Sequence, residues 1–215
     1  MKLDNMQEIL SVAQEMGEGV YKLFSESLDY IPHLGRFIQT VKFNRLERRM
    51  NENSVQLQRI GKLLKSSTLS DEYITQRIFP IVLADLIEEH EDAKFNLILN
   101  GFENVFIDEK EEESIVINYF DTLRNLRYKD IKRLLYLAEE MDSYVLPKPN
   151  SEEESFAWSI DNKLAIYGLI KTDYILDASK PIRTSPVRRD EFFVTPYGNR
   201  FLKFIRTIRE EVAGA

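Results

Sequence analysis

Four ionisable residues in the middle of the chain have types that can bind a metal or transfer protons. Asp85, Glu89 and Asp92 follow one another at intervals of four and three, so on one helix their carboxylates would share a face, with His90 among them. Helical di-metal sites place a Glu-x-x-His pair on each of two helices, and His90 has no such spacing. We therefore interpret these residues as a solvated acidic face with His90 on the apolar side. A carboxylate-rich metal enzyme remains the third alternative.

Other common catalytic motifs are missing from the sequence. The chain has no cysteine, which excludes disulfides, thiolate zinc sites, iron–sulfur clusters and cysteine nucleophiles. No Gly-x-Ser-x-Gly elbow accompanies the serines, and the Gly17-Glu18-Gly19 stretch lacks the strand and third glycine of a phosphate-binding loop. We therefore expect no catalytic residues, no cofactor and no resident metal.

Length and charge bound the remaining possibilities. The 215 residues are 43% apolar, which is enough for a real core, and no apolar run approaches the ~18 residues of a membrane helix. The first ten residues lack the pattern of a secretory signal, so we expect a cytoplasmic protein. The net charge is −7, with basic stretches at 33–65 and 160–215 around an acidic middle. A uniformly basic nucleic-acid footprint is therefore absent.

The clearest hydrophobic pattern lies within residues 35–65. Its positions repeat at alternating intervals of three and four, and they are Phe43, Leu46, Met50, Asn53, Leu57, Ile60 and Leu64. This spacing predicts a long heptad helix, and one asparagine in the seam of a coiled coil fixes register and partner number. Two interpretations stay open. The helix packs along other helices of its own chain, or it forms the seam of a homodimer.

The rest of the chain is predicted to form further helices and two strands. An amphipathic helix is predicted over 3–31, and a helix after Ser70 carries a kink at Pro80 and an apolar phase continuing to Val105. From about residue 115 the order is helix, helix, helix, strand, long loop, strand, helix. We expect an N-terminal helical part over 1–108 and a second part over 109–215.

This C-terminal order is that of a winged helix with one β-hairpin between Ile170 and Val194. Basic side chains there could contact phosphates, namely Lys163, Lys180, Arg183, Arg188 and Arg189. The third helix, however, begins with Glu152-Glu153-Glu154, which a phosphate backbone would repel. Protein docking is therefore the favoured use of this part, and a winged-helix DNA-binding transcriptional regulator is the alternative.

Two segments near the end of the chain, LAIYGLI (164–170) and FFVTPYGNRFLKFI (192–205), resemble the C-terminal part of the abortive-infection alpha family of bacterial and phage proteins. The matching positions are Gly168, Leu169, Ile170, Thr195, Gly198 and Phe201. The resemblance covers about the last fifty residues and implies a mostly helical protein in phage defence or phage–host conflict, without an agreed catalytic centre. From the residues themselves, Gly168 should let the chain leave a helix, and Thr195 should cap the last helix.

Together these observations predict a mainly α protein, built as a helical bundle with a long heptad helix followed by the winged-helix-like part. The predicted function is non-catalytic protein–protein interaction, with a homodimer as one form.

Overall fold

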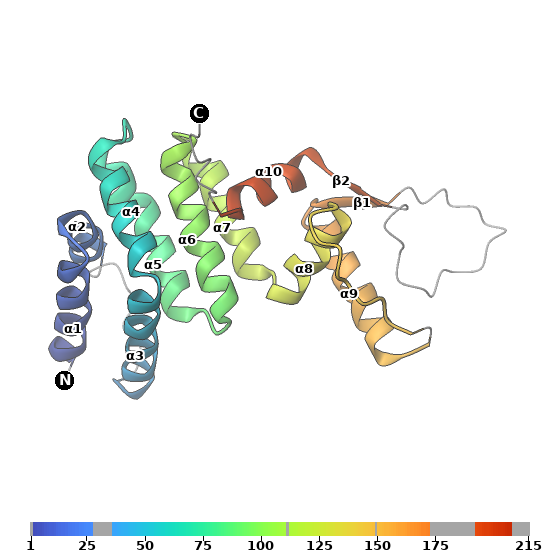
Figure 1. Cartoon of the computed structure of the whole chain (residues 1–215), viewed down its shortest axis with the longest axis horizontal. Helices are drawn as coiled ribbons and strands as arrows, with labels where there is room; N and C mark the ends of the chain where they lie inside the picture. Colours follow the sequence, from blue (N-terminus) through green and yellow to red (C-terminus); the bar gives the residue numbers. More distant parts are fainter. Residues whose placement is uncertain (1, 28–35, 111, 149, 173–191, 208–215) are drawn as a thin grey trace, which may run out of the picture. The chain divides into compact units, whose positions relative to one another are not determined.

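The computed structural model describes residues 2–27, 36–110, 112–148, 150–172 and 192–207. These residues are mainly helical with a small two-stranded antiparallel sheet, which confirms the predicted mainly α class (Figure 1). The chain divides into two compact units, which are 1–124 with 204–215, and 125–203. We call these unit 1 and unit 2. The division falls at residue 125 rather than after residue 108, and residues from 204 onward rejoin unit 1.

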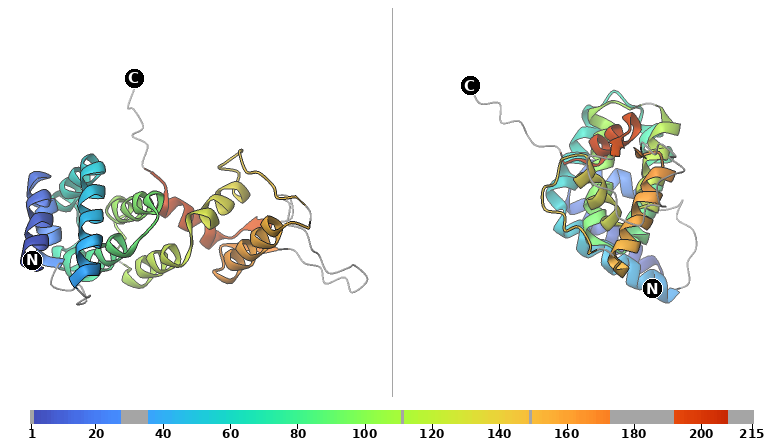
Figure 2. Two further views of the ribbon diagram at one scale, coloured as in Figure 1. Left: turned by 90° about the horizontal axis from the view of Figure 1, so that it is seen from below. Right: turned by 90° about the vertical axis from the view of Figure 1, so that its right-hand side faces the viewer.

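Each of the two long helices predicted at the start of the chain is broken into two. They form α1 (Lys2–Glu15), α2 (Glu18–Ser27), α3 (Arg36–Glu52) and α4 (Ser54–Ser66). The chain leaves the first helix at Gly17, where φ is +119°. The expected single heptad helix is corrected to α3 and α4, since Asn53 has non-helical dihedral angles and its side-chain amide donates to the Arg49 carbonyl at 2.9 Å. In unit 1, α1 packs against α3 and α2 against α4 (Figures 1 and 2).

The α2–α4 contact depends on two glycines. A Cβ atom on Gly19 would lie 2.2 Å from the Gly61 carbonyl oxygen, and one on Gly61 would lie 3.0 Å from the Val20 nitrogen. Gly19 lies in the first turn of α2 and Gly61 inside α4, where glycine costs about 1 kcal/mol relative to alanine. The cost is offset because the two backbones approach more closely than any side chain would allow.

The predicted distortion at Pro80 is a short π-helix. It spans Tyr73–Ile78 and leads directly into α5 (Phe79–Glu88). The amide of Phe79 bonds to the Ile74 carbonyl, five residues back. In that register the partner of the Thr75 carbonyl would be the amide of residue 80, which proline lacks. The buried Ser27 hydroxyl donates to this carbonyl at 2.9 Å instead.

The two following helices complete the core of unit 1. They are α6 (Asp92–Ile107) and α7 (Glu113–Asn125). Phe204 returns to this core, stacks on Tyr119 with ring centroids 4.8 Å apart and contacts Phe120 edge-on at 5.1 Å. These contacts explain why α7 belongs to unit 1.

Buried polar side chains on α6 bond to α4 on one side and to the end of the last helix on the other. Asn104 donates to the carbonyl of Phe204 at 2.8 Å, and Asn100 donates to the carbonyl of Ile205 at 3.1 Å. Glu103, only 1% exposed, forms a salt bridge with the Arg59 guanidinium on α4. The polar side chains therefore satisfy the last carbonyls of the final helix and pair a buried charge.

Unit 2 follows the predicted order of elements. It contains α8 (Tyr128–Leu137), α9 (Glu152–Ile166), β1 (Ile170–Thr172), β2 (Phe192–Val194) and the start of α10 (Pro196–Ile205). As predicted, the chain leaves α9 at Gly168, where φ is +68°, and Thr195 caps α10 by accepting the Gly198 amide at 2.9 Å.

The centre of unit 2 holds a buried ion pair. Arg133 on α8 is fully buried and donates two hydrogen bonds to Asp161 on α9, at 2.7 and 2.9 Å. Its guanidinium also lies 5.1 Å from the ring centroid of Tyr144 and 5.5 Å from that of Tyr136. A charge this deeply buried is tolerated because a buried carboxylate pairs with it and aromatic rings surround it.

Candidate protein-interaction surface

The apolar seam predicted for a homodimer is buried against other helices of the same chain. Its side chains lie on α3 and α4 and are at most 8% exposed, these being Phe43, Leu46, Met50, Leu57, Ile60 and Leu64. Asn53 is half-buried at the break between the two helices. The seam faces α1, α2 and α5 of the same chain and presents no free surface to a second copy.

The carboxylates proposed as a metal alternative do not share a helix face. Helix α5 ends at Glu88 and α6 begins at Asp92, so Glu89 and His90 lie in the connection. His90 is exposed, with its Nδ1 2.9 Å from a guanidinium nitrogen of Arg45, and does not lie in the core as the apolar phase had indicated. Within the described residues, no group of three ligand-type side chains could hold a metal ion.

Each of these carboxylates is paired with a cation. Asp85 accepts two hydrogen bonds from Arg124, at 2.5 and 3.1 Å. Burial raises the pKa of Asp85 above its ordinary value, although Arg124 opposes the rise. Asp92 accepts from Arg49 at 2.7 Å and from Arg48 at 3.1 Å, and these guanidinium groups lower its pKa. The expected solvated acidic face is thus a set of ion pairs that joins helices.

Glu89 forms the most buried of these pairs. Its carboxylate lies 2.7 Å from the Lys94 amine, which is 1% exposed, and accepts the amides of His90 at 2.7 Å and Glu91 at 2.8 Å. Burial by itself raises the pKa of Glu89, but these hydrogen bonds outweigh it and leave the pKa below its ordinary value. Glu89 therefore acts as an ionised group that fixes the backbone of the connection leading into α6.

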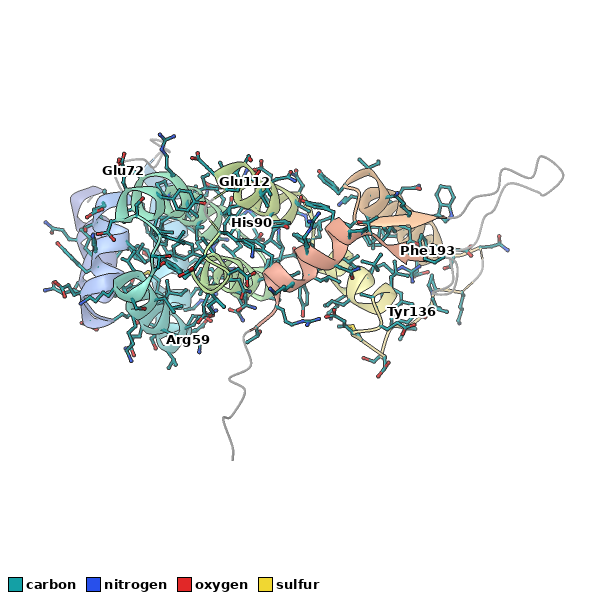
Figure 3. The ribbon with its side chains drawn as sticks, turned by 90° about the horizontal axis from the view of Figure 1, so that it is seen from above. Arg59, Glu72, His90, Glu112, Tyr136 and Phe193 are labelled. Carbon is teal, nitrogen blue, oxygen red and sulfur yellow. The ribbon has the colours of Figure 1, made fainter. Side chains whose placement is uncertain are left out.

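The most exposed apolar side chains of unit 2 point to a different kind of site. Of the ten exposed large hydrophobic residues in the described part of the chain, five belong to this smaller unit, and they are Val145, Leu146, Phe156, Ile166 and Phe193. Ile166 at the end of α9 is 82% exposed, and Phe193 in β2 is 57% exposed. Phe193 is labelled in Figure 3.

Helix α9 is positioned so that one side stays free. The Ser151 hydroxyl accepts the Glu154 amide at 3.2 Å and caps the start of α9, and the Glu154 carboxylate accepts the Asn150 amide at 2.6 Å. The buried side consists of Glu154, Ala157, Ile160, Asp161 and Leu164. The opposite side is exposed along its whole length, and we define the α9 face as Glu152, Ser155, Ser159, Asn162 and Ile166.

The hairpin exposes an apolar side chain by simple alternation. Residues 170 and 194 pair, as do 171 and 193, and 172 and 192. Ile170 and Phe192 are buried, so Lys171 and Phe193 lie together on the outward side of the two strands. This side is mixed in character, with one cation beside one aromatic ring.

The predicted phosphate-contacting residues are only partly described. The amine of Lys163 lies 2.8 Å from the carboxylate of buried Asp130, so its charge is paired within unit 2. The other four, Lys180, Arg183, Arg188 and Arg189, lie outside the described residues.

Phe156 and Ile166 are apolar residues of a helix, which by itself favours burial, and the structure exposes both. A signal was present, because Ile166 falls on the helix side opposite Ala157 and Leu164 at 100° per residue. Phe156 is flanked by Lys129, whose amine lies 4.4 Å from its ring centroid.

Comparisons with protein families, with curated proteins and with solved structures found no match for this chain. None of the helices in the described residues is both long and apolar enough to span a membrane.

Proposed function

We propose that this chain is a non-catalytic interaction protein that binds a protein partner through unit 2. The observation that carries the proposal is the exposure of Phe156, Ile166 and Phe193 on α9 and the neighbouring hairpin. Apolar side chains of this size bind partners when they group on one part of a surface, whereas isolated ones are common on any protein. The ion-paired state of the central carboxylates favours a structural role for them over catalysis.

The biological setting of the proposal is bacterial phage defence or phage–host conflict, in the cytoplasm. It rests on the resemblance of the C-terminal segments to the abortive-infection alpha family, and the lack of cysteine suits a reducing compartment. The winged-helix-like order of three helices and a hairpin along the sequence is part of the same proposal, and it would serve as a docking module.

The test compares three forms of the full chain as bait in lysates of bacteria, before and after phage infection. Wild type and Val55→Asp should retain the same bacterial or phage protein, because Val55 is exposed on α4 in unit 1, far along the chain from α9. Phe193→Asp should lose it, since a carboxylate would be desolvated in the contact. Retention that is equal for all three forms, or no specific retention, contradicts the proposal.

The alternative function is DNA binding by a winged-helix regulator. The hairpin favours it, because the segment joining its strands carries Lys180, Arg183, Arg188 and Arg189. Four acidic residues in the same segment oppose it, these being Asp173, Asp177, Asp190 and Glu191. Binding to duplex DNA should then weaken steeply with salt, and Arg188→Ala with Arg189→Ala should reduce the salt slope by about two. No retention on duplex DNA at low salt removes this alternative.

A further inference from the structure

The connection between α8 and α9 runs from residue 138 to residue 151, and its described residues form no helix or strand (Figures 1 and 2). Connections longer than about 12–15 residues without secondary structure are uncommon in compact domains, and those with a defined course usually have a function. This one is fixed to unit 2 at two points. Tyr144 stacks on Tyr136 with ring centroids 4.9 Å apart, and the Asn150 amide donates to the Glu154 carboxylate at 2.6 Å.

The burial of residues in this connection repeats every three positions. Met141, Tyr144 and Pro147 are half-buried, and the residues between them are exposed. Val145 is 91% exposed, the highest value among the large apolar side chains that the structure describes, and Leu146 is 47% exposed. A strand alternates every two positions and an α-helix every 3.6, whereas a polyproline II helix has three residues per turn. The segment 141–148 thus has the period of a polyproline II helix with one side on unit 2.

The sequence explains this conformation. Pro147 fixes its own φ at about −65°, and Leu146 and Lys148 are each followed by a proline, which restricts both residues to extended backbone. Residues 143–148 contain no turn or bend. From Val145 to Lys148, no backbone group bonds to another described residue. A polyproline II helix has the same property, since its backbone makes no internal hydrogen bonds.

We propose that the segment 141–148 binds a groove lined with aromatic rings on a protein partner, the kind of groove that recognises polyproline II helices. The inference rests on the proposed function and names the chemistry of the partner's site. Val145 and Leu146 lie on the two sides that face away from unit 2, so their side chains enter the groove. Donors on the partner bond to the carbonyls that this chain leaves unbonded. Because the segment is extended before it binds, little ordering entropy opposes the association.

The competing mode for an extended segment is addition to the edge of a partner's sheet. In a strand, the amides of residues 147 and 149 would point to the same edge, and both residues are prolines, which have no amide hydrogen. That edge cannot continue a ladder of hydrogen bonds. The three-residue period of burial is also not the period of a strand. The observations therefore favour the groove.

The first test places a photo-crosslinking phenylalanine analogue at residue 145 of the full chain, in the lysates of the preceding experiment. The analogue should crosslink to the protein that wild type retains, within a peptide of that protein that contains aromatic residues. The same analogue at residue 55, on exposed α4 of unit 1, is the matched control and should not crosslink to it. A crosslink to nucleic acid, or no crosslink from residue 145 to the retained protein, overturns the inference.

The second test measures the dissociation constant of the purified partner and distinguishes a groove from a sheet edge. Replacing both Pro147 and Pro149 with alanine should raise this constant at least about fourfold, because the free segment gains conformational freedom. Pro196→Ala is the matched control and should leave the constant unchanged, since Pro196 is the exposed first residue of α10. Strand addition predicts an unchanged or lower constant for the double variant, because alanine supplies the missing amides, and that result overturns the inference. Circular dichroism checks the fold of each variant.

Failure of the inference differs from failure of the proposed function. Val145→Asp should lose the retained protein, because a carboxylate would be desolvated in an apolar groove. If Phe193→Asp loses the protein and Val145→Asp retains it, the groove inference alone is wrong. If wild type retains no specific protein, both proposals are wrong.

Discussion

The Ser27 hydroxyl donates a hydrogen bond to the Thr75 carbonyl at 2.9 Å, across 48 positions of sequence. This carbonyl belongs to the π-helix before Pro80, and the proline ring leaves it without its backbone donor. A serine on α2 thus supplies the hydrogen bond that is missing where Pro80 joins the π-helix to α5.

Replacing Ser27 with alanine should lower the free energy of unfolding by about 1–3 kcal/mol, because a buried carbonyl loses its partner. Urea denaturation followed by circular dichroism measures the change. Ser25→Ala is the control on the same helix, since that half-buried hydroxyl bonds only to the nearby Lys22 carbonyl, and it should change stability by less than about 0.5 kcal/mol.

The loss of stability caused by Ser27→Ala should depend on Pro80. In a Pro80→Ala background the new amide at residue 80 can bond to the Thr75 carbonyl, so the effect of Ser27→Ala should shrink. A double-mutant cycle measures this coupling, and additive effects would show that the serine acts for another reason.

The glycine crossing of α2 and α4 should tolerate no side chain. Gly61→Ala is expected to destabilise the chain by about 1–3 kcal/mol, although alanine is the better helix former, because the new methyl would meet the Val20 backbone. Gln58→Ala, exposed on the same helix, should be neutral within about 0.5 kcal/mol. Thermal unfolding of both variants checks this, and a stabilised Gly61→Ala would refute the close contact.

The buried pair of unit 2 should be far more sensitive than a surface pair. Asp161→Asn leaves the fully buried Arg133 without its counter-charge and should cost about 3–5 kcal/mol. The exposed Arg48–Glu52 pair on α3 supplies the comparison, and Glu52→Gln should cost less than about 1 kcal/mol. Denaturant unfolding distinguishes the two, and equal losses would contradict the burial of Arg133.

Glu89 should make stability fall in acid. Its folded-state pKa lies below the ordinary value of 4.5, so the unfolded chain takes up the proton first as the pH decreases. The stabilisation is therefore complete well above pH 4.5 and disappears as the pH falls through the lowered pKa. Glu89→Gln should remove this part of the acid dependence and destabilise the chain at pH 7, because buried Lys94 loses its counter-charge.

Urea titrations from pH 7 to pH 3 measure how the free energy of unfolding changes with pH in wild type and in Glu89→Gln. Glu88→Gln is the neighbouring control, because that glutamate is half-exposed and pairs only with Lys42 at the surface. An unchanged slope in Glu89→Gln would show that other carboxylates cause the acid loss.

The helical class and the order of the C-terminal elements were predictable, since apolar spacing and the caps at Ser151 and Thr195 are local signals. The breaks in the first helices were not. Only one non-helical residue, Asn53, separates α3 from α4, so apolar residues still recur at intervals of three and four across the break. The hydrophobic pattern therefore predicts one continuous helix. The choice between an internal seam and a dimer seam also required the positions of α1 and α2.

The candidate surface was harder to predict than the core. Helix α9 has apolar residues on several sides, and only the packing of Ala157, Ile160 and Leu164 shows which side is buried. The role of Asp85 and Glu89 depended on Arg124 and Lys94, which lie in other helices or beyond a chain turn. Pairwise chemistry between distant positions leaves no mark on a single sequence.

The return of Phe204 to unit 1 has a consequence for synthesis on the ribosome. Unit 2 is an insertion, so the stacking partners Tyr119 and Phe120 emerge some eighty residues before the ring that covers them. During translation these aromatic side chains stay uncovered until Phe204 has been synthesised. A nascent chain halted before residue 204 would therefore expose apolar surface that chaperones and proteases recognise.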